Sequence, residues 1–261
     1  MDSRIIIATH KEYWMPEDSI YVPVLVGAAL KGEDELRRFS SYSRDDEGEN
    51  ISSKNKNYCE LTGLYWAWNN LDASYLGLVH YRRHFTIRRK GTKQERVLNK
   101  KDLRMALRRS DILLPKKRKY YIETNYSQYV HAHHAADLDI TRDIILEKYP
   151  EYVEAFDQSM KRTSGHRFNM FIMKADYFRE YCEWLFDILF ELEKRLDISD
   201  YNENDSRVFG FVSERLLDVW IDTKNYDYLE LPYIFMEHQN WIIKGWNFLK
   251  RKFLGILQKR S

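Results

Sequence analysis

The stretch Tyr75-Leu76-Gly77-Leu78-Val79-His80-Tyr81-Arg82-Arg83-His84 decides the fold of this chain. Its first part is apolar and predicts a buried β-strand, and cationic side chains follow at once. In open α/β sheets, ligands bind beyond the carboxyl ends of the strands. We therefore expect His80, Arg82 and Arg83 to bind pyrophosphate, because arginine forms bidentate, charge-assisted hydrogen bonds to phosphate oxygens. The alternative is that the two arginines merely begin a solvated basic stretch.

The sequence on either side of this stretch predicts a mostly parallel sheet. Residues 4–10 form a β-branched run that is typical of a buried parallel strand. In residues 58–71, Leu61, Leu64, Tyr65 and Trp68 recur with helical spacing and predict an amphipathic helix. Strand, helix and strand in this order indicate a βαβ unit.

The remaining segments alternate between strand and helix patterns. We expect strands at 21–27, at an edge because of Pro23, and at 111–115 and 167–173. Residues 40–57 are polar and predict a surface loop. The expected helices are 100–109, 137–149, 150–161, 175–196 and 207–220. These patterns predict a single Rossmann-type α/β domain over residues 1–240.

The composition excludes several classes of protein. Of the 261 residues, 44% are hydrophobic and 15% aromatic, which is enough for a core and excludes general disorder. No apolar run is long enough to span a membrane, and the apolar part of the start is too short for a secretion signal. Two cysteines, Cys59 and Cys182, form neither a disulfide framework nor a cysteine-rich zinc site. We therefore expect a cytoplasmic protein.

The net charge of +2 conceals a strong asymmetry. Residues 82–119 hold 16 Lys and Arg against three acids, whereas the remainder has a net charge of −11. Such a basic segment usually binds phosphate, nucleic acid or an anionic membrane. We expect no nucleic-acid partner, because the sequence has no recognised nucleic-acid-binding module.

Residues 241–261 differ from the rest of the chain, with six basic residues and no acids. Their apolar residues follow helical spacing, which predicts a basic amphipathic helix that lies on an anionic membrane surface. A terminal helix packed on the domain is the alternative. The residues expected at the membrane are Trp241, Ile242, Trp246, Leu249, Lys250, Arg251 and Phe253.

Polar residues near the predicted strand ends are further ligand candidates. Thr9, His10 and Lys11 follow the first strand and are expected to contact the same ligand as the arginines. Other candidates lie in loops or stand out as polar residues in apolar surroundings. They are Asp45, Asp46, Asn50, Lys54 and Asn55 for a nucleoside, and His131, His133, His134, Asn169 and Arg207 for phosphate or hydroxyl groups.

Several long stretches resemble a known family, although the common phosphate-binding glycine motifs and the serine-hydrolase motif are absent. They are DDEGENISSKN, YCELTGLYWAW and YLGLVHYRRHF between residues 45 and 85, then residues 131–137, RFNMFIMK and RVFGFVSERL. Over residues 4–238 the chain is similar to bacterial capsule and exopolysaccharide glycosyltransferases long filed under a domain of unknown function.

The resemblance implies a GT-A-like domain that transfers a sugar from a nucleotide donor, UDP-linked in expectation, to a glycan on polyprenyl pyrophosphate. Some members of the family are associated with galactofuranose or galactose. The enzyme would lie peripherally on the inner face of the plasma membrane. A non-catalytic scaffold of polysaccharide assembly is the first alternative, and a nucleic-acid-binding protein that uses residues 82–119 is the second.

The resemblance also has implications for the metal cofactor and for the catalytic base. Many GT-A enzymes hold Mg²⁺ or Mn²⁺ with an Asp-x-Asp motif, but here His80 to Arg83 stand at the corresponding place. We expect no metal cofactor, with Asp137 and Asp139 as the alternative metal site. Asp137, Glu214 and His80 are the candidate catalytic residues, the two acids as general bases. Alternatively, each acid only stabilises a helix N-terminus.

Overall fold

The computed structural model describes residues 2–237, and the predicted amphipathic segment 241–261 lies outside this range. Within it, a nine-stranded sheet runs in the order β10-β6-β9-β4-β1-β2-β3, with β5 joined to β4 and β11 joined to β5. The strands are β1 Ser3–Thr9, β2 Tyr21–Leu25, β3 Ser43–Arg44, β4 Tyr75–His80, β5 Arg83–Phe85, β6 Ile112–Pro115, β9 Phe171–Lys174, β10 Leu229–Leu231 and β11 Tyr233–Phe235. A separate pair consists of β7 Arg118–Lys119 and β8 Ser164–Gly165.

The expected α/β fold with a mostly parallel sheet is confirmed. Strand β1 pairs in parallel with β2 and with β4, and β6 pairs in parallel with β10. Strand β9 runs antiparallel between β4 and β6. Strand β4, which Arg82 and Arg83 follow, therefore has a paired strand on each side, and its carboxyl end lies next to that of β1.

Helices cover both faces of the sheet, which explains why its strands are apolar without alternation. Ile6 of β1 packs with α3 (Leu61–Asn70) and α8 (Ala175–Arg195). Ile5 and Ile7 point the other way and pack with α4 (Lys100–Leu107). All three isoleucines are fully buried.

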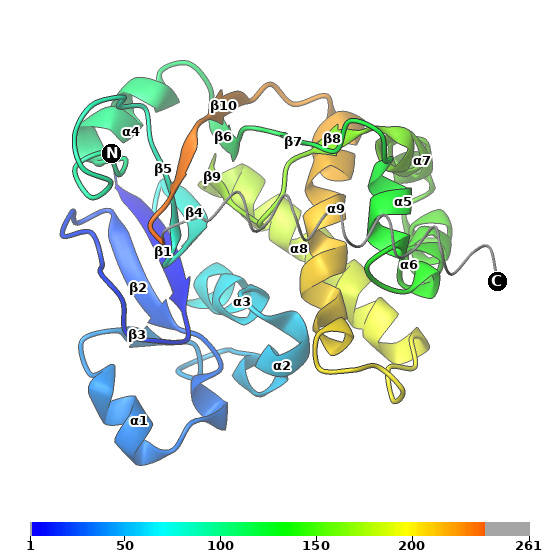
Figure 1. Ribbon diagram of the computed structural model, residues 1–261, viewed down its shortest axis with the longest axis horizontal. Helices are drawn as coiled ribbons and strands as arrows, with labels where there is room; N and C mark the ends of the chain where they lie inside the picture. Colours follow the sequence, from blue (N-terminus) through cyan, green and yellow to red (C-terminus); the bar gives the residue numbers. More distant parts are fainter. Residues whose placement is uncertain (1, 238–261) are drawn as a thin grey trace.

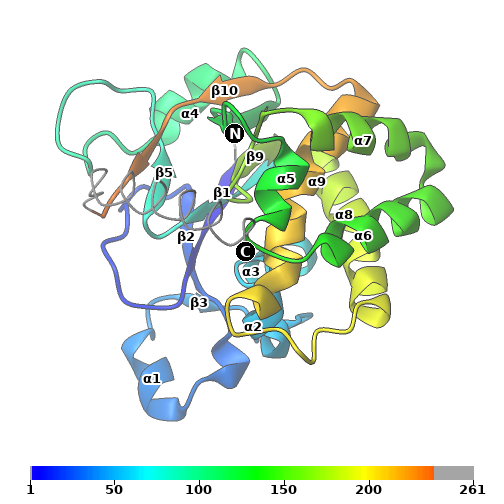
Figure 2. The same ribbon diagram turned by 45° about the vertical axis from the view of Figure 1, so that its right-hand side comes forward.

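The helices after residue 120 gather on one side of the molecule (Figures 1 and 2). There α9 (Val208–Lys224) packs against α7 (Val153–Lys161) and α8, while α5 (Asn125–Val130) and α6 (Ala135–Lys148) lie further from β1–β3. Two short helices, α1 (Glu33–Arg38) and α2 (Asn55–Tyr58), follow β2 and β3. No helix within residues 2–237 is long and apolar enough to cross a membrane.

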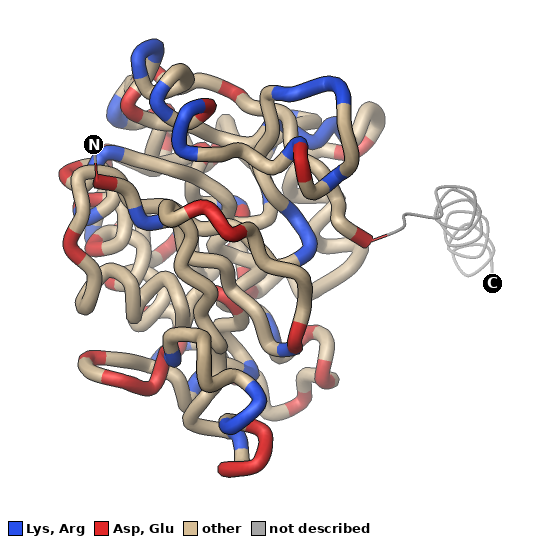
Figure 3. The backbone as a smooth tube through the Cα atoms, turned by 90° about the vertical axis from the view of Figure 1, so that its left-hand side faces the viewer, with Lys and Arg blue, Asp and Glu red and all other residues tan. Residues whose placement is uncertain are grey.

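Basic residues concentrate at one end of the molecule. The segments containing most of the Lys and Arg between residues 82 and 119 lie at the top in Figure 3, around α4 and the strands beside it. The charge asymmetry of the sequence is thus also an asymmetry in space.

Three local expectations are wrong. Strand β2, expected at an edge because of Pro23, lies between β1 and β3, although β3 pairs only with Val24 and Leu25 and not with Pro23. The strand predicted at 167–173 begins only at Phe171, because Phe168 and Asn169 have positive φ angles of 76° and 51° that no strand accommodates. The polar segment 40–57 is not simply a surface loop, because Asp45 is fully buried. Its carboxylate accepts hydrogen bonds from the backbone N–H groups of residues 27 and 28 and from two hydroxyls, of Ser52 and Thr62.

Acid is expected to destabilise the fold through His84, which is fully buried on β5. Burial lowers the pKa of His84 from 6.5 to about 4. Between these pH values the unfolded chain binds a proton that the native state excludes, so the free energy of unfolding falls as pH decreases, by up to about 3 kcal/mol. We expect the free energy of unfolding, measured with urea between pH 7 and pH 4, to decline less in His84→Leu than in His131→Leu. His131 is the control because its imidazole is exposed. Equal declines in the two variants would contradict this assignment.

Candidate functional site

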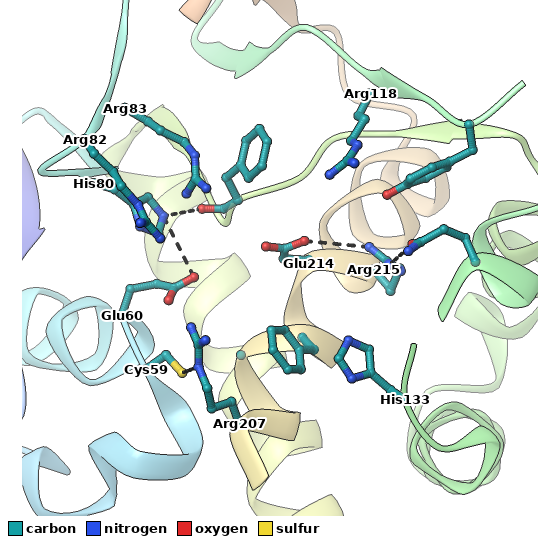
Figure 4. Close-up of a pocket in the computed structure, with 15 residues that line it drawn as sticks. Cys59, Glu60, His80, Arg82, Arg83, Arg118, His133, Arg207, Glu214 and Arg215 are labelled. Carbon is teal, nitrogen blue, oxygen red and sulfur yellow. Dashed lines mark hydrogen bonds and ion pairs between the residues drawn. The ribbon is translucent and has the colours of Figure 1, made fainter. Parts of the chain in front are cut away.

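A pocket of about 300 Å³ opens at the carboxyl end of β4 (Figure 4). Its other walls are formed by the junction of α2 and α3, the turn before β9 and the first two turns of α9, with β7 and α5 on the side away from β4. The residues that line it are Cys59, Glu60, His80, Arg82, Arg83, Arg118, Tyr120, Gln128, His133, Phe168, Arg207, Gly210, Phe211, Glu214 and Arg215.

The pocket is strongly cationic. Five arginines line it, against only two carboxylates, Glu60 and Glu214. Arginines rarely converge without counter-charges, because each one loses hydration when it leaves water. The excess of guanidinium groups therefore favours a ligand with more than one negative charge.

Arg83 is the residue most clearly left without a partner. Its Nε is buried and has no hydrogen-bond partner within the described residues. The guanidinium packs on the Phe168 ring, 4.3 Å from its centroid. Burial and the neighbouring Arg82 lower the pKa of Arg83, although a guanidinium remains charged at neutral pH. The donors of Arg83 are thus available to an anion.

His80 holds the turn that carries this wall of the pocket. Its Nε2 lies 2.5 Å from the carbonyl oxygen of Phe168. Burial lowers the pKa of His80 to about 4, so the ring is neutral at physiological pH and Nε2 must donate its hydrogen to that carbonyl. Nε2 is therefore committed to the turn, which points to a positioning role for His80 rather than the catalytic role expected from the sequence.

Glu60 and Asn169 form a buried network beneath the arginines. The Asn169 amide donates to Glu60 Oε1 at 2.8 Å and to the Gly210 carbonyl at 3.2 Å, and its oxygen accepts from the Ser213 hydroxyl. Burial raises the pKa of Glu60, while the bond from Asn169 opposes that shift. Asn169 is consequently satisfied within the protein and positions Glu60 instead of contacting the ligand.

Glu214 is the more accessible carboxylate. It lies on α9, and its side chain is 24% exposed against 14% for Glu60. One oxygen lies 3.7 Å from Nη1 of Arg215. In Figure 4 the Glu214 side chain points into the pocket, with Arg82 and Arg83 on one side and Arg118 on the other. This position suits a group that exchanges a proton with a bound substrate.

Unusual backbone conformations cluster at the pocket. Cys59 has φ 52° and ψ −129°, and Phe168 and Asn169 also have positive φ. For residues other than glycine such angles are costly, and they are found where function requires a fixed geometry. The bend at Cys59 is held by Asn55, whose amide donates to the Cys59 carbonyl at 2.7 Å. It aims Cys59 and Glu60 at the pocket.

The carboxylate of Glu237 would compete with a bound anion for the cations at the edge of the pocket. Glu237 lies 3.7 Å from Arg82 and 3.3 Å from Lys11. The segment is held there by pairing of β11 with β5 and by the Met236 N–H, which donates to the Arg82 carbonyl. An anion that binds Arg82 must therefore displace or share this contact with Glu237.

Glu237→Gln is expected to tighten the binding of inorganic pyrophosphate two- to fivefold at low salt. The ion pairs of Glu237 are partly exposed and individually weak, which limits the effect. Isothermal titration calorimetry measures it, and the gain should shrink as ionic strength rises. Weaker binding in Glu237→Gln would contradict competition at Arg82.

The structure brings only some of the predicted ligand residues to the pocket. His80, Arg82, Arg83, His133, Arg207 and Glu214 line it. His10 lies beside it, where burial and the positive charges of Lys11 and Arg82 lower its pKa. The Thr9 hydroxyl instead donates to the Lys11 carbonyl at 2.6 Å, in the turn after β1.

The five candidates for nucleoside contact are engaged with other parts of the protein in this structure. Asp45 is buried by the hydrogen bonds described above, and Asp46 pairs with Arg44. Asn50 donates to backbone carbonyls of its own loop, and Lys54 pairs with Glu193 of α8 at 2.5 Å. Asn55, as noted, holds the bend at Cys59. None of these side chains lines the pocket.

The histidine cluster and its acids do not form one site. Asp137, 1% exposed, accepts hydrogen bonds from the hydroxyls of Tyr129 and Tyr201, which corrects its expected role as base. Asp139, two residues along α6, accepts from Tyr126. His131 pairs with Glu123, while His133 and His134 both contact Asp205. Within residues 2–237 no group of three His, Cys, Asp or Glu side chains is arranged to hold a metal.

Sequence reasoning missed several pocket residues. Glu60 and Arg215 left a signal, since each is charged within a largely apolar helical segment. Arg118 lies in a long basic run, so the sequence does not distinguish it from its neighbours. Nothing in the sequence indicates the strained turn at Phe168. Also missed were Cys59, Tyr120, Gln128, Gly210 and Phe211.

The sheet, with a cationic pocket at the carboxyl end of a central parallel strand, is that of a GT-A-like α/β domain. The chain belongs to the family described as domain of unknown function DUF4422, which matches residues 4–225. This confirms the resemblance seen in the motifs. No curated protein matches the sequence.

Among solved structures, the chain is similar to the apo form of the bifunctional glycosyltransferase WbbM. The TM-score is 0.81 and the sequence identity 31%. The match covers 91% of this chain but 46% of the WbbM chain, so the chain spans about half the length of that protein.

Proposed function

We propose that the protein is a glycosyltransferase that uses a nucleoside diphosphate sugar as donor. The observation that carries the proposal is the guanidinium of Arg83 beside Arg82, whose buried Nε has no hydrogen-bond partner within the described residues, in a pocket that also holds Glu214. The similarity to a bifunctional glycosyltransferase supports it.

In this mechanism, Arg82 and Arg83 bind the diphosphate and stabilise the negative charge that grows on it as the bond to the anomeric carbon breaks. The acceptor hydroxyl attacks that carbon from the opposite side and gives its proton to the Glu214 carboxylate. The products are the new glycosidic bond, the nucleoside diphosphate and protonated Glu214, which releases its proton to water. Such a single displacement inverts the anomeric configuration.

The guanidinium groups would take the place of a divalent ion. They are always charged and line the pocket to which we assign the diphosphate. Mg²⁺ or Mn²⁺ bound with the diphosphate itself is the alternative.

The finer substrate assignments come from the family resemblance. We propose a UDP-linked donor, with galactose or galactofuranose as the first sugars to test, and a glycan on polyprenyl pyrophosphate as acceptor in capsule, exopolysaccharide or O-antigen synthesis. A thermal-shift screen of nucleoside diphosphates and their sugars, followed by an assay for nucleoside diphosphate release, tests the donor. If no nucleotide raises the melting temperature and no nucleotide sugar is turned over, the proposal fails.

Deletion of residues 241–261 is expected to move the protein from the membrane fraction to the soluble fraction of a cell lysate. The basic and aromatic pattern of this segment is the reason, since both features favour an anionic lipid interface. Fractionation with a tagged protein measures the change, and Trp246→Glu provides a milder variant. Unchanged membrane retention of the shortened chain would contradict the assignment.

A further inference from the structure

The wall of the pocket farthest from β4 carries two cations that the diphosphate does not need. Arg118 belongs to β7 and Arg215 to α9. In Figure 4 they stand across the pocket from Arg82, with Glu214 between the two groups. A diphosphate held by Arg82 and Arg83 would leave this wall free.

Arg215 is a buried cation with incomplete hydrogen bonding. The residue is 5% exposed, and one terminal nitrogen donates to Gln128 at 2.7 Å. Its Nε and Nη1 have no hydrogen-bond partner within the described residues. The carboxylate of Glu214 is 3.7 Å from Nη1, beyond hydrogen-bond distance. Unpaired donors on a buried charge are costly, and an anionic oxygen would satisfy them.

Arg118 adds a second charge, and this residue is exposed. Its side chain lies over the Tyr120 ring, 5.4 Å from the centroid, and forms no ion pair with the residues that the structure describes. One fixed and one exposed guanidinium can together bind both oxygens of a carboxylate or several oxygens of a phosphate.

The position of Glu214 makes this a separate subsite. A carboxylate between two groups of cations repels a single polyanion that would extend from one group to the other. If Glu214 takes the proton of the acceptor hydroxyl, the acceptor must lie on the side of Glu214 away from the departing diphosphate. That side is the one that Arg118 and Arg215 line.

We propose that Arg118 and Arg215 form a second anion subsite, which binds a carboxylate or phosphate group of the sugar acceptor. This inference rests on the proposed function, because it uses the order donor, base, acceptor. The enzyme would then prefer an acidic acceptor sugar, or one linked directly to phosphate, over a neutral sugar.

The test uses the full chain saturated with inorganic pyrophosphate, which fills the first subsite. Calorimetric titrations compare methyl glucuronoside with methyl glucoside, and glucose 1-phosphate with glucose. We expect at least one acidic sugar to bind about tenfold or more tightly than its neutral counterpart, the size of one charge-assisted hydrogen bond. Which of the two acids binds better distinguishes a uronic acid from a sugar phosphate.

Arg118→Gln is expected to remove most of this preference while pyrophosphate still binds. Arg215→Lys serves as the buried variant, and retention of the melting temperature checks its folding. Equal affinities for acidic and neutral sugars, or a preference that both variants leave unchanged, would overturn the second subsite. Failure of the wild-type chain to bind pyrophosphate would instead count against the proposed function.

Discussion

Glu214→Gln is expected to lower the turnover number for sugar transfer by 10²–10⁴, the usual contribution of a general base. Glutamine keeps the size and hydrogen-bonding shape of the side chain but does not accept a proton at neutral pH. The affinity for pyrophosphate should remain or increase, because a negative charge leaves a pocket lined by arginines. Release of nucleoside diphosphate from the donor, with acceptor present, measures the loss.

Glu60→Gln is the matched control, since Glu60 is the other carboxylate that lines the pocket. It is more buried and already accepts a hydrogen bond from Asn169, so we expect a smaller loss of turnover. Near-normal turnover in Glu214→Gln together with an inactive, folded Glu60→Gln would transfer the role of base to Glu60.

Arg82→Gln and Arg83→Gln are expected to weaken the binding of nucleoside diphosphate by 10- to 100-fold each, and to reduce kcat/KM by about 10³. The larger effect on catalysis follows because charge grows on the diphosphate in the transition state. Arg82 is the cleaner test, since its side chain is 40% exposed and its removal leaves the core intact. Binding is measured by calorimetry and turnover by diphosphate release.

Arg89→Gln provides the control for a general effect of charge. Arg89 is exposed and belongs to the same basic segment, but it does not line this pocket. Its removal should change binding less than twofold at physiological salt. If Arg82→Gln and Arg83→Gln bind and turn over like Arg89→Gln, the clamp is assigned to the wrong residues.

The architecture could be predicted from the sequence because the elements around β4 are strongly patterned. The apolar runs of β1 and β4 and the helical spacing in α3 each match one type of structure. The late start of β9 could not be predicted, because Phe168 and Asn169 carry no sequence signal for positive φ. Their conformation depends on tertiary contacts with His80 and Glu60.

The site was predicted in part for a related reason. Residues at strand ends, such as Arg82 and Arg83, can be located once the strand is known. Polar residues in loops cannot, because a sequence does not show whether a carboxylate faces a ligand or the backbone. Asp45 and Asp137 both proved to be buried acceptors of internal hydrogen bonds. Arg215 stands out as a charge within an apolar helical segment, but only the packing of α9 brings it to the pocket.

The central claim is that guanidinium groups, and not a metal held by acids, bind the leaving diphosphate. The most direct measurement is the affinity for UDP by calorimetry in excess EDTA and again with Mg²⁺ or Mn²⁺, on the wild-type chain and on Arg82→Gln. We predict that wild-type affinity changes less than threefold between these conditions and that Arg82→Gln loses at least tenfold in both. Binding that is absent in EDTA, restored by the metal and indifferent to Arg82→Gln would contradict the claim.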